Sequence, residues 1–165
     1  MKKCIILQIN YLILICLFIP CVAIAQPICQ IQRFSAYNGL AQRSVTNILQ
    51  DSKGFIWFST WNGLNKFDGY TFKNYKAFPG DGCTLTSNRF AKITQTQTCD
   101  IWCQTYDERV YLFDSRRERF IDILRPYEDQ RHQSYAVQNI YTLPKGISWI
   151  VCNRGAFRID EQIYK

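Results

Sequence analysis

Histidine is nearly absent from this chain of 165 residues, since His132 is the only one. It stands in the short sequence Arg-His-Gln-Ser, which lacks the surroundings of a phosphoacceptor histidine. A glycine-rich nucleotide-binding segment is absent as well. These two absences exclude a kinase domain from the chain, and we expect no catalytic residue here.

Charge is also scarce. Charged residues make up 20% of the sequence, against 47% hydrophobic and 15% aromatic residues, which is typical of a β-rich globular protein and excludes a disordered one. The net charge is +7, but the basic residues are scattered, with only short runs such as Arg116-Arg117. We therefore expect solvated outer strands rather than a nucleic-acid-binding patch.

The N-terminus has the three parts of a secretory signal peptide. A basic start at Lys2 and Lys3 precedes an apolar stretch at 5–19 and an Ala-x-Ala cleavage site. We predict that residues 1–25 are removed, which lowers the net charge from +7 to +5 and places the mature chain in the periplasm. An uncleaved membrane anchor and a lipoprotein signal ending at Cys21 are the alternatives.

Residues 44–75 predict four short strands separated by tight turns. The strands are rich in aromatic and β-branched residues, and each break contains Asp, Asn or Gly. Asp68-Gly69 between two such runs is a strong hairpin signal. The expected strands are 45–49, 55–59, 64–67 and 70–75. An antiparallel meander of this kind is one blade of a β-propeller.

The same pattern returns at a period of 45 to 47 residues, as in propeller repeats. An isoleucine precedes a tryptophan by nine residues in each repeat, and an aspartate follows. The three sets are Ile48, Trp57 and Asp68, then Ile93, Trp102 and Asp114, and finally Ile140, Trp149 and Asp160. We expect each tryptophan to wedge between neighbouring blades as core, not to contact a ligand.

The predicted fold is all-β, with about three four-stranded antiparallel blades of an incomplete propeller after a signal peptide. Strands are expected at 90–94, 101–105, 110–113 and 119–123 in the second repeat, and at 137–143, 148–152 and 156–159 in the third. We divide the chain into a signal peptide at 1–25, a lead-in at 26–43, and blades at 44–84, 85–131 and 132–165, the last one truncated. Within the lead-in, 32–35 is expected to form a strand.

Five of the eight cysteines follow the predicted signal peptide, and an odd number cannot all pair within one chain. Cys103 and Cys152 lie in predicted strands, where we expect small core fillers. Cys99 and Cys103 are four residues apart without a second pair, so no metal site or cofactor is expected. A disulfide can form in an oxidising compartment, but nothing selects a pairing among Cys29, Cys83, Cys99, Cys103 and Cys152.

The first repeat closely resembles the two-component regulator propeller repeat, and the second and third match it mainly at the Ile, Trp and Asp positions. The resemblance covers nearly all of residues 32–165. It rests on Gly39-Leu40, Val45, Ile48, Gln50-Asp51, Gly54-Phe55-Ile56-Trp57-Phe58, Thr60, the run from Gly63 to Tyr70, and Phe72.

That resemblance implies the N-terminal periplasmic sensor region of a hybrid two-component histidine kinase. In this family, tandem propellers precede a β-sandwich, a transmembrane helix and cytoplasmic kinase, receiver and DNA-binding domains, and the sensors typically detect oligosaccharides. Everything after the third blade is missing here. The resemblance therefore implies a sensor fragment of an inner-membrane protein, with the remaining propeller blades, of the same or another chain, and an oligosaccharide as partners.

Propellers usually bind ligands at the loops between the second and third strands. An aromatic ring beside amides and charges suits a sugar, because the ring stacks on C–H faces while polar groups fix the hydroxyls. The alternative is that Trp61 only covers a neighbouring blade. The candidate ligand-binding residues are Trp61 and Asn62, Tyr106 and Asp107, and Asn153 and Arg154.

Two other functions compete with the sensor. The spacing of Asp51, Gly54 and Trp57 is similar to the Asp-box turn of sialidase propellers, but it is off by one residue and no catalytic carboxylate pair can be placed. A small binding protein that completes a propeller by oligomerising is the other, since known propellers have roughly four to eight blades and an open array exposes edge strands.

Overall fold

The structure is a computed structural model that describes residues 29–78, 85–128 and 135–162. The chain divides into two units, 1–33 and 34–165, and the described part of the first, 29–33, has no regular secondary structure. The predicted signal peptide, His132 and Cys83 lie outside the described residues. None of the helices within the described ranges has the length and apolarity to cross a membrane.

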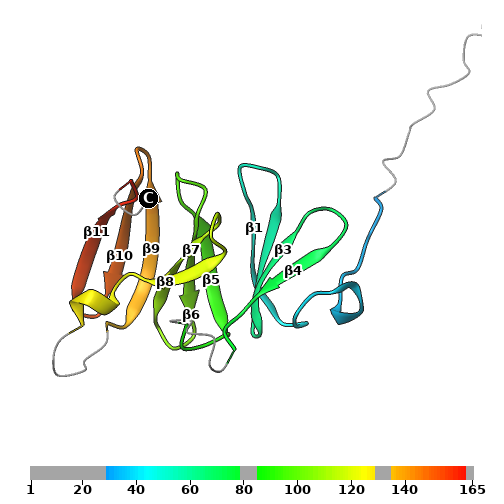
Figure 1. Ribbon diagram of the computed structural model, residues 1–165, viewed down its shortest axis with the longest axis horizontal. Coiled ribbons are helices and arrows are strands. Elements are labelled where there is room, and N and C mark those ends of the chain that lie inside the picture. Colours follow the sequence, from blue (N-terminus) through cyan, green and yellow to red (C-terminus); the bar gives the residue numbers. More distant parts are fainter. Residues whose placement is uncertain (1–28, 79–84, 129–134, 163–165) are drawn as a thin grey trace, which may run out of the picture. The chain divides into compact units, whose positions relative to one another are not determined.

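Residues 34–162 form three antiparallel sheets, each a meander in which neighbouring strands follow one another in the sequence (Figure 1). The first sheet contains β1 (Val45–Gln50), β2 (Ile56–Thr60), β3 (Gly63–Phe67) and β4 (Phe72–Tyr75). The second contains β5 (Phe90–Gln95), β6 (Ile101–Thr105), β7 (Val110–Asp114) and β8 (Arg119–Asp122). The third contains β9 (Val137–Leu143), β10 (Ile147–Cys152) and β11 (Gly155–Asp160). The predicted all-β class is confirmed, and each strand starts and stops within two residues of its predicted bounds.

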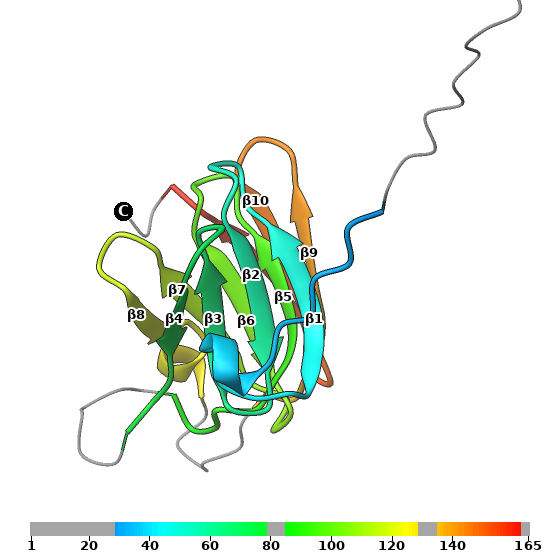
Figure 2. The same ribbon diagram turned by 90° about the vertical axis from the view of Figure 1, so that its right-hand side faces the viewer.

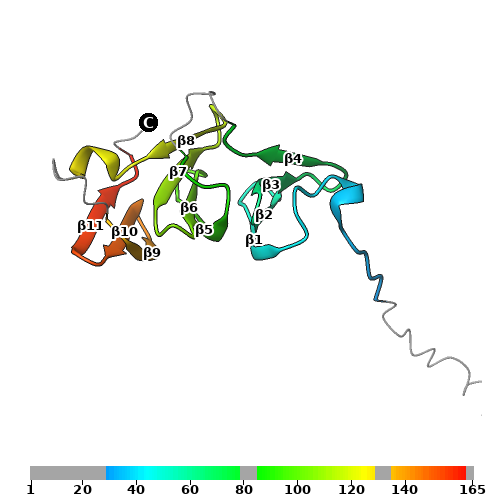
Figure 3. The same cartoon turned by 90° about the horizontal axis from the view of Figure 1, so that it is seen from below.

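The three sheets lie face to face in sequence order within 34–165 (Figures 1 and 2), with β5 against β1 and β2, and β9 against β5. Figure 3 shows the first strands β1, β5 and β9 along one side and the last strands β4 and β8 along the other. In each sheet, the residue after the second strand donates its backbone N–H to the carbonyl before the first strand. These bonds join Trp61 to Ser44 at 3.3 Å, Tyr106 to Arg89 at 3.0 Å and Asn153 to Ala136 at 3.0 Å.

Apolar side chains fill both interfaces between sheets. Trp57 lies in the first interface with Phe90 and Ile93 of the next sheet. Trp102 lies in the second interface with Val137 and Ile140. The tryptophan of one blade therefore packs on the first strand of the next, as the repeat predicts.

The outer ends of this series differ from the expected pattern. Trp149 is 37% exposed and Ile48 is 60% exposed, although both hold the repeat positions that are buried elsewhere. The physical reason is that each of them points to a sheet face that no other described sheet covers. Burial at these positions comes from the neighbouring blade and not from the blade itself.

The strand predicted at 32–35 is not formed. Its backbone pairs with no strand among the described residues, so nothing holds it extended. Instead, Phe34 packs edge-on against Phe67 and Phe72, with ring centroids 4.9 and 5.5 Å apart. The chain then turns through the 3₁₀ helix Ala36–Asn38, and Asn65 accepts the backbone N–H of Ala41 at 2.8 Å. Residues 34–41 are thus anchored to the face of the first sheet opposite Trp57.

The repeat aspartates close the turns after the third strands. Asp68 accepts backbone N–H groups of Tyr70 and Thr71 at 2.8 and 2.7 Å. These bonds, that from Thr71 above all, hold the pKa of Asp68 below its usual value. Asp114 and Asp160 accept backbone N–H groups in the corresponding turns. All three therefore have a structural role.

Candidate functional site

Trp61 and Tyr106 lie at the same end of neighbouring sheets, each just after the second strand. Their side chains are 47% and 53% exposed. The two rings meet edge to face, with centroids 6.1 Å apart and an interplanar angle of 81°. Edge-to-face contact is a preferred arrangement of aromatic pairs, and both rings remain about half exposed to solvent. The structure therefore brings these two predicted site residues together as an exposed aromatic pair.

Arg89 is a third member of this surface that the sequence pattern did not indicate. It is exposed, and its Cζ atom lies 5.9 Å from the centroid of the Trp61 ring, within the range of a cation–π contact. Its place directly before β5 corresponds to Ser44 and Ala136 in the other repeats. Because no charged residue stands at those positions, repeat alignment gives no signal for Arg89.

Asp107 is held in a fixed position beside the aromatic pair. Its Oδ2 accepts the hydroxyl of Thr86 at 2.6 Å, and that hydroxyl lies 2.8 Å from the hydroxyl of Tyr111. Burial raises the pKa of Tyr111, so its phenol stays protonated at neutral pH. Asp107 thus presents a preorganised carboxylate, with one oxygen engaged by Thr86.

The other predicted site residues have more local roles. Asn62 donates its backbone N–H to Thr60 Oγ1 at 3.1 Å, which closes its own turn. Asn153 is tied to Ala136, whose backbone N–H its Oδ1 accepts at 3.2 Å. Arg154 follows on the same loop and is exposed. The contacts thus support Trp61, Tyr106 and Asp107 as a cluster more strongly than these three residues.

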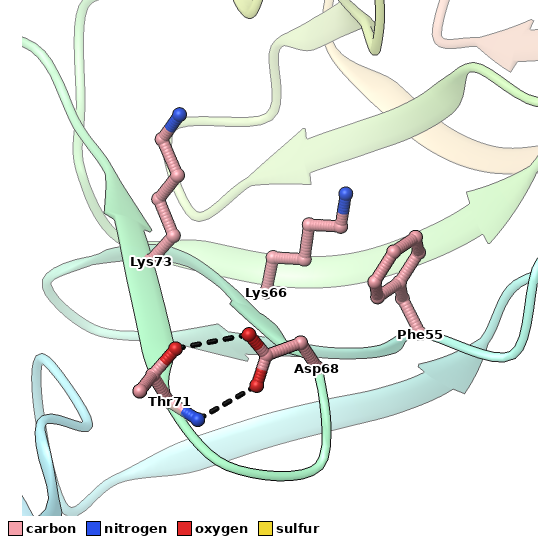
Figure 4. Close-up of a pocket in the computed structure, with 5 residues that line it drawn as sticks. All are labelled: Phe55, Lys66, Asp68, Thr71 and Lys73. Carbon is pink, nitrogen blue, oxygen red and sulfur yellow. Dashed lines mark hydrogen bonds between the residues drawn. The ribbon is translucent and has the colours of Figure 1, made fainter.

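A pocket of about 200 Å³ lies at the opposite end of the first sheet, and its lining was not predicted. It is bounded by Phe55, Lys66, Asp68, Thr71 and Lys73 (Figure 4). Lys66 Nζ sits 3.7 Å from the centroid of the Phe55 ring. Asp68 is engaged by Thr71, as Figure 4 shows.

Most of the charge in this pocket is already neutralised. Lys73 Nζ contacts both carboxylate oxygens of Glu118, from the second sheet, at 2.6 and 2.7 Å. Tyr75 donates its hydroxyl to the same carboxylate at 2.9 Å. These bonds join the first two sheets. We interpret the pocket as part of the packing between blades and place the candidate site at the aromatic pair.

The described residues contain no group of three or more His, Cys, Asp or Glu side chains that could hold a metal ion. Asp51, considered above as part of an Asp-box-like motif, accepts the backbone N–H groups of Lys53 and Phe55 at 2.9 and 3.0 Å. Its other oxygen accepts the indole N–H of Trp57 at 2.8 Å. All these bonds serve the turn, so Asp51 has a structural role.

Comparison with known proteins supports the propeller fold. Residues 39–62 match the two component regulator propeller family. Over 53 residues, 32% of this chain and 4% of the relative, the sequence is 47% identical to histidine kinase P4 of Formosa agariphila. The extracellular domain of the hybrid two component system BT3049 from B. thetaiotaomicron has a TM-score of 0.64 and 27% identity, covering 80% of this chain and 19% of that one. The corresponding domain of BT4673 has a TM-score of 0.53 at 23% identity, covering 72% and 17%, and it supports the fold alone.

The repeated meander, the interface tryptophans and these similarities define a β-propeller domain of the kind found outside the cell in hybrid two-component systems. The chain contains a match to the two component regulator propeller repeat at 39–62, and it is similar over most of its length to the extracellular domain of BT3049. It spans about a fifth of the solved extracellular domains that it resembles, and 4% of the curated kinase.

Proposed function

We propose that this chain is the N-terminal part of a periplasmic ligand-sensing propeller that belongs to a longer hybrid two-component signalling protein. The similarity to extracellular domains of such systems supports this role, and the N-terminal signal pattern supports export. In this proposal the chain binds and does not catalyse. The remaining blades are its structural partners, while kinase activity resides in a cytoplasmic region of the longer protein.

The ligand that suits the aromatic pair is an oligosaccharide. Trp61 and Tyr106 offer exposed rings for the C–H face of a sugar, and their contact limits the entropy lost on binding. Arg89 and Asp107 flank the rings with a donor and an acceptor for hydroxyl groups. This grouping of rings and fixed polar side chains from two blades is the observation that carries the proposal.

Signalling then requires that the sugar bind one arrangement of the sensor more tightly than another, because only differential affinity shifts an equilibrium. A site built by two neighbouring blades meets this need, since its geometry changes when the blades move relative to each other. Binding of an oligosaccharide panel to the Trp61→Ala sensor is the direct test, and its controls are given in the Discussion.

A further inference from the structure

The indole N–H of the interface tryptophan has a different partner in each interface. Trp57 donates to Asp51 in the turn of its own sheet. In the second repeat Thr96 takes the place of Asp51 and uses its hydroxyl within its own turn, where it accepts the backbone N–H of Asp100 at 2.9 Å. The second tryptophan therefore has no carboxylate partner in its own turn.

The third sheet supplies the missing acceptor. Trp102 donates its indole N–H to Ser148 Oγ at 2.9 Å, and both side chains are buried. Ser148 donates its hydroxyl in turn to Glu161 Oε1. The other oxygen, Oε2, accepts the backbone N–H of Gln97 at 2.8 Å, back in the second sheet. Ser148 stands directly before the tryptophan of its own blade, a position held by Ile101 in the second repeat.

The third tryptophan again has no acceptor in its own turn, because Leu143 occupies the place of Asp51 and has no polar side chain. Trp149 lies on the outer face of the third sheet, paired across strands with Tyr141. Tyr141 and Leu143, from β9, are exposed as well. This outer face therefore offers an apolar surface with an indole donor within it.

We infer that this outer face binds the next propeller blade of the sensor, and that this blade carries a serine, threonine or carboxylate directly before its own tryptophan. The inference rests on the proposed function, which supplies the next blade. The two interior interfaces indicate which other residues of the next blade should cover Trp149. Apolar residues three apart on the first strand cover the tryptophan in both, Phe90 with Ile93 in one and Val137 with Ile140 in the other.

The third repeat itself has every feature that the next blade needs, so a second copy of it can serve as the probe. Residues 117–165 are joined directly after Gln162, which preserves the repeat spacing because Asp160 corresponds to Asp114. The matched control carries Ser148→Ala in the added copy only. The indole N–H signal of Trp149 is assigned by comparison with a Trp149→Phe variant, and its hydrogen exchange is followed by NMR.

The added blade is expected to slow exchange at Trp149, and the Ser148→Ala copy to give exchange about tenfold faster than the serine copy, as loss of one hydrogen bond implies. In the alanine version, Leu143→Asp in the original third repeat should restore slow exchange, because this position corresponds to Asp51 and supplies an acceptor within the turn. Slow exchange that is the same with serine and alanine would overturn the acceptor requirement.

Other outcomes contradict the docking itself. Fast exchange at Trp149 in the extended chain, or an added copy that stays unfolded, would contradict docking of the next blade. The added copy carries Val137, Ile140 and Ser148, which the inference requires of that blade. Protection of Trp149 in the unextended chain as its concentration rises would make a second copy the occupant and overturn the inference. Sugar binding does not enter the readout, so failure of the proposed ligand site and failure of blade docking are distinguishable.

Discussion

Trp102 and Ser148 join the second and third sheets through one buried hydrogen bond of 2.9 Å. In the preceding blade, the equivalent tryptophan, Trp57, is satisfied by Asp51 of its own turn. Both blades thus keep the buried tryptophan, but the acceptor of its indole N–H comes from the same blade in the first repeat and from the next blade in the second. Because the acceptor for Trp102 comes from the next blade, this interface depends on both blades being folded.

Replacing Ser148 with alanine should lower the free energy of unfolding by about 1–3 kcal/mol, the usual cost of leaving buried polar groups unpaired. The variant removes a partner from both Trp102 and Glu161. Urea unfolding followed by tryptophan fluorescence measures the change. Gln138→Ala, at an exposed position on β9, is the control. A Ser148→Ala protein as stable as this control would contradict the structural role of the bond.

Gly63 and Gly155 hold the same repeat position and differ in their surroundings. Both have a left-handed backbone, with φ of 118° and 129°. A Cβ on Gly63 would lie 2.8 Å from the carbonyl oxygen of Tyr75, whereas one on Gly155 meets nothing within 4 Å. Each alanine variant should lose about 1–2 kcal/mol from backbone strain. Gly63→Ala should lose more, and thermal unfolding in which the two variants are equal would contradict this.

Glu118 should make stability depend on pH in the acid range. Its hydrogen bonds from Lys73, and then from Tyr75, hold the pKa of the carboxyl below its usual 4.5. A pKa lowered on folding stabilises the protein above the unfolded pKa, and that contribution is lost as pH falls through the folded pKa. The effect is small because the carboxylate is partly exposed and screened by solvent.

Thermal unfolding between pH 6 and about pH 3 therefore should show a weaker loss of melting temperature in Glu118→Gln than in the unmodified chain. Raising the salt concentration should reduce the difference between the two proteins, because salt screens exposed ion pairs. Parallel pH profiles for the two proteins would show that Glu118 does not contribute.

Two cysteines should resist modification in the folded protein. Cys103 and Cys152 are buried, and burial raises the pKa of both thiols, so the reactive thiolate is scarce. Cys29 is exposed and Cys99 partly so. We expect maleimide at neutral pH to label Cys29 and Cys99 first, and the buried pair only after unfolding in urea. Peptide mapping by mass spectrometry measures this, and rapid native labelling of Cys103 would contradict its place in the core.

Strand positions and blade order could be predicted from the sequence because they depend on local composition and on a fixed repeat. The same is true of the turn aspartates and of Cys103 and Cys152 as core residues. The exposure of Trp149 and Ile48 could not be predicted from the sequence, because burial at these positions depends on a neighbouring blade. A repeat position indicates where a side chain points but not whether another sheet covers it.

The polar details also escape sequence reasoning. Ser148 lies where the other repeats have isoleucine, and its role as the acceptor for Trp102 is visible only in the contact between the two sheets. Arg89 has no charged counterpart in the other repeats, and it joins the candidate site through the ring of Trp61. The predicted lead-in strand failed for a related reason, because a strand needs a neighbour to pair with. In each instance the missing information is a contact between distant parts of the chain.

The most direct test of the proposed ligand site compares Trp61→Ala with Tyr70→Ala in the full sensor. Tyr70 is 92% exposed in the turn after β3, at the other end of the first sheet, so it controls for loss of an exposed aromatic ring. Binding to a panel of neutral and acidic oligosaccharides is measured by calorimetry, with melting temperature recorded alongside. We predict at least about fivefold weaker binding for Trp61→Ala, an unchanged melting temperature and normal binding by Tyr70→Ala. Equal affinity in the unmodified protein and Trp61→Ala, or binding of no oligosaccharide by the unmodified protein, would contradict the account.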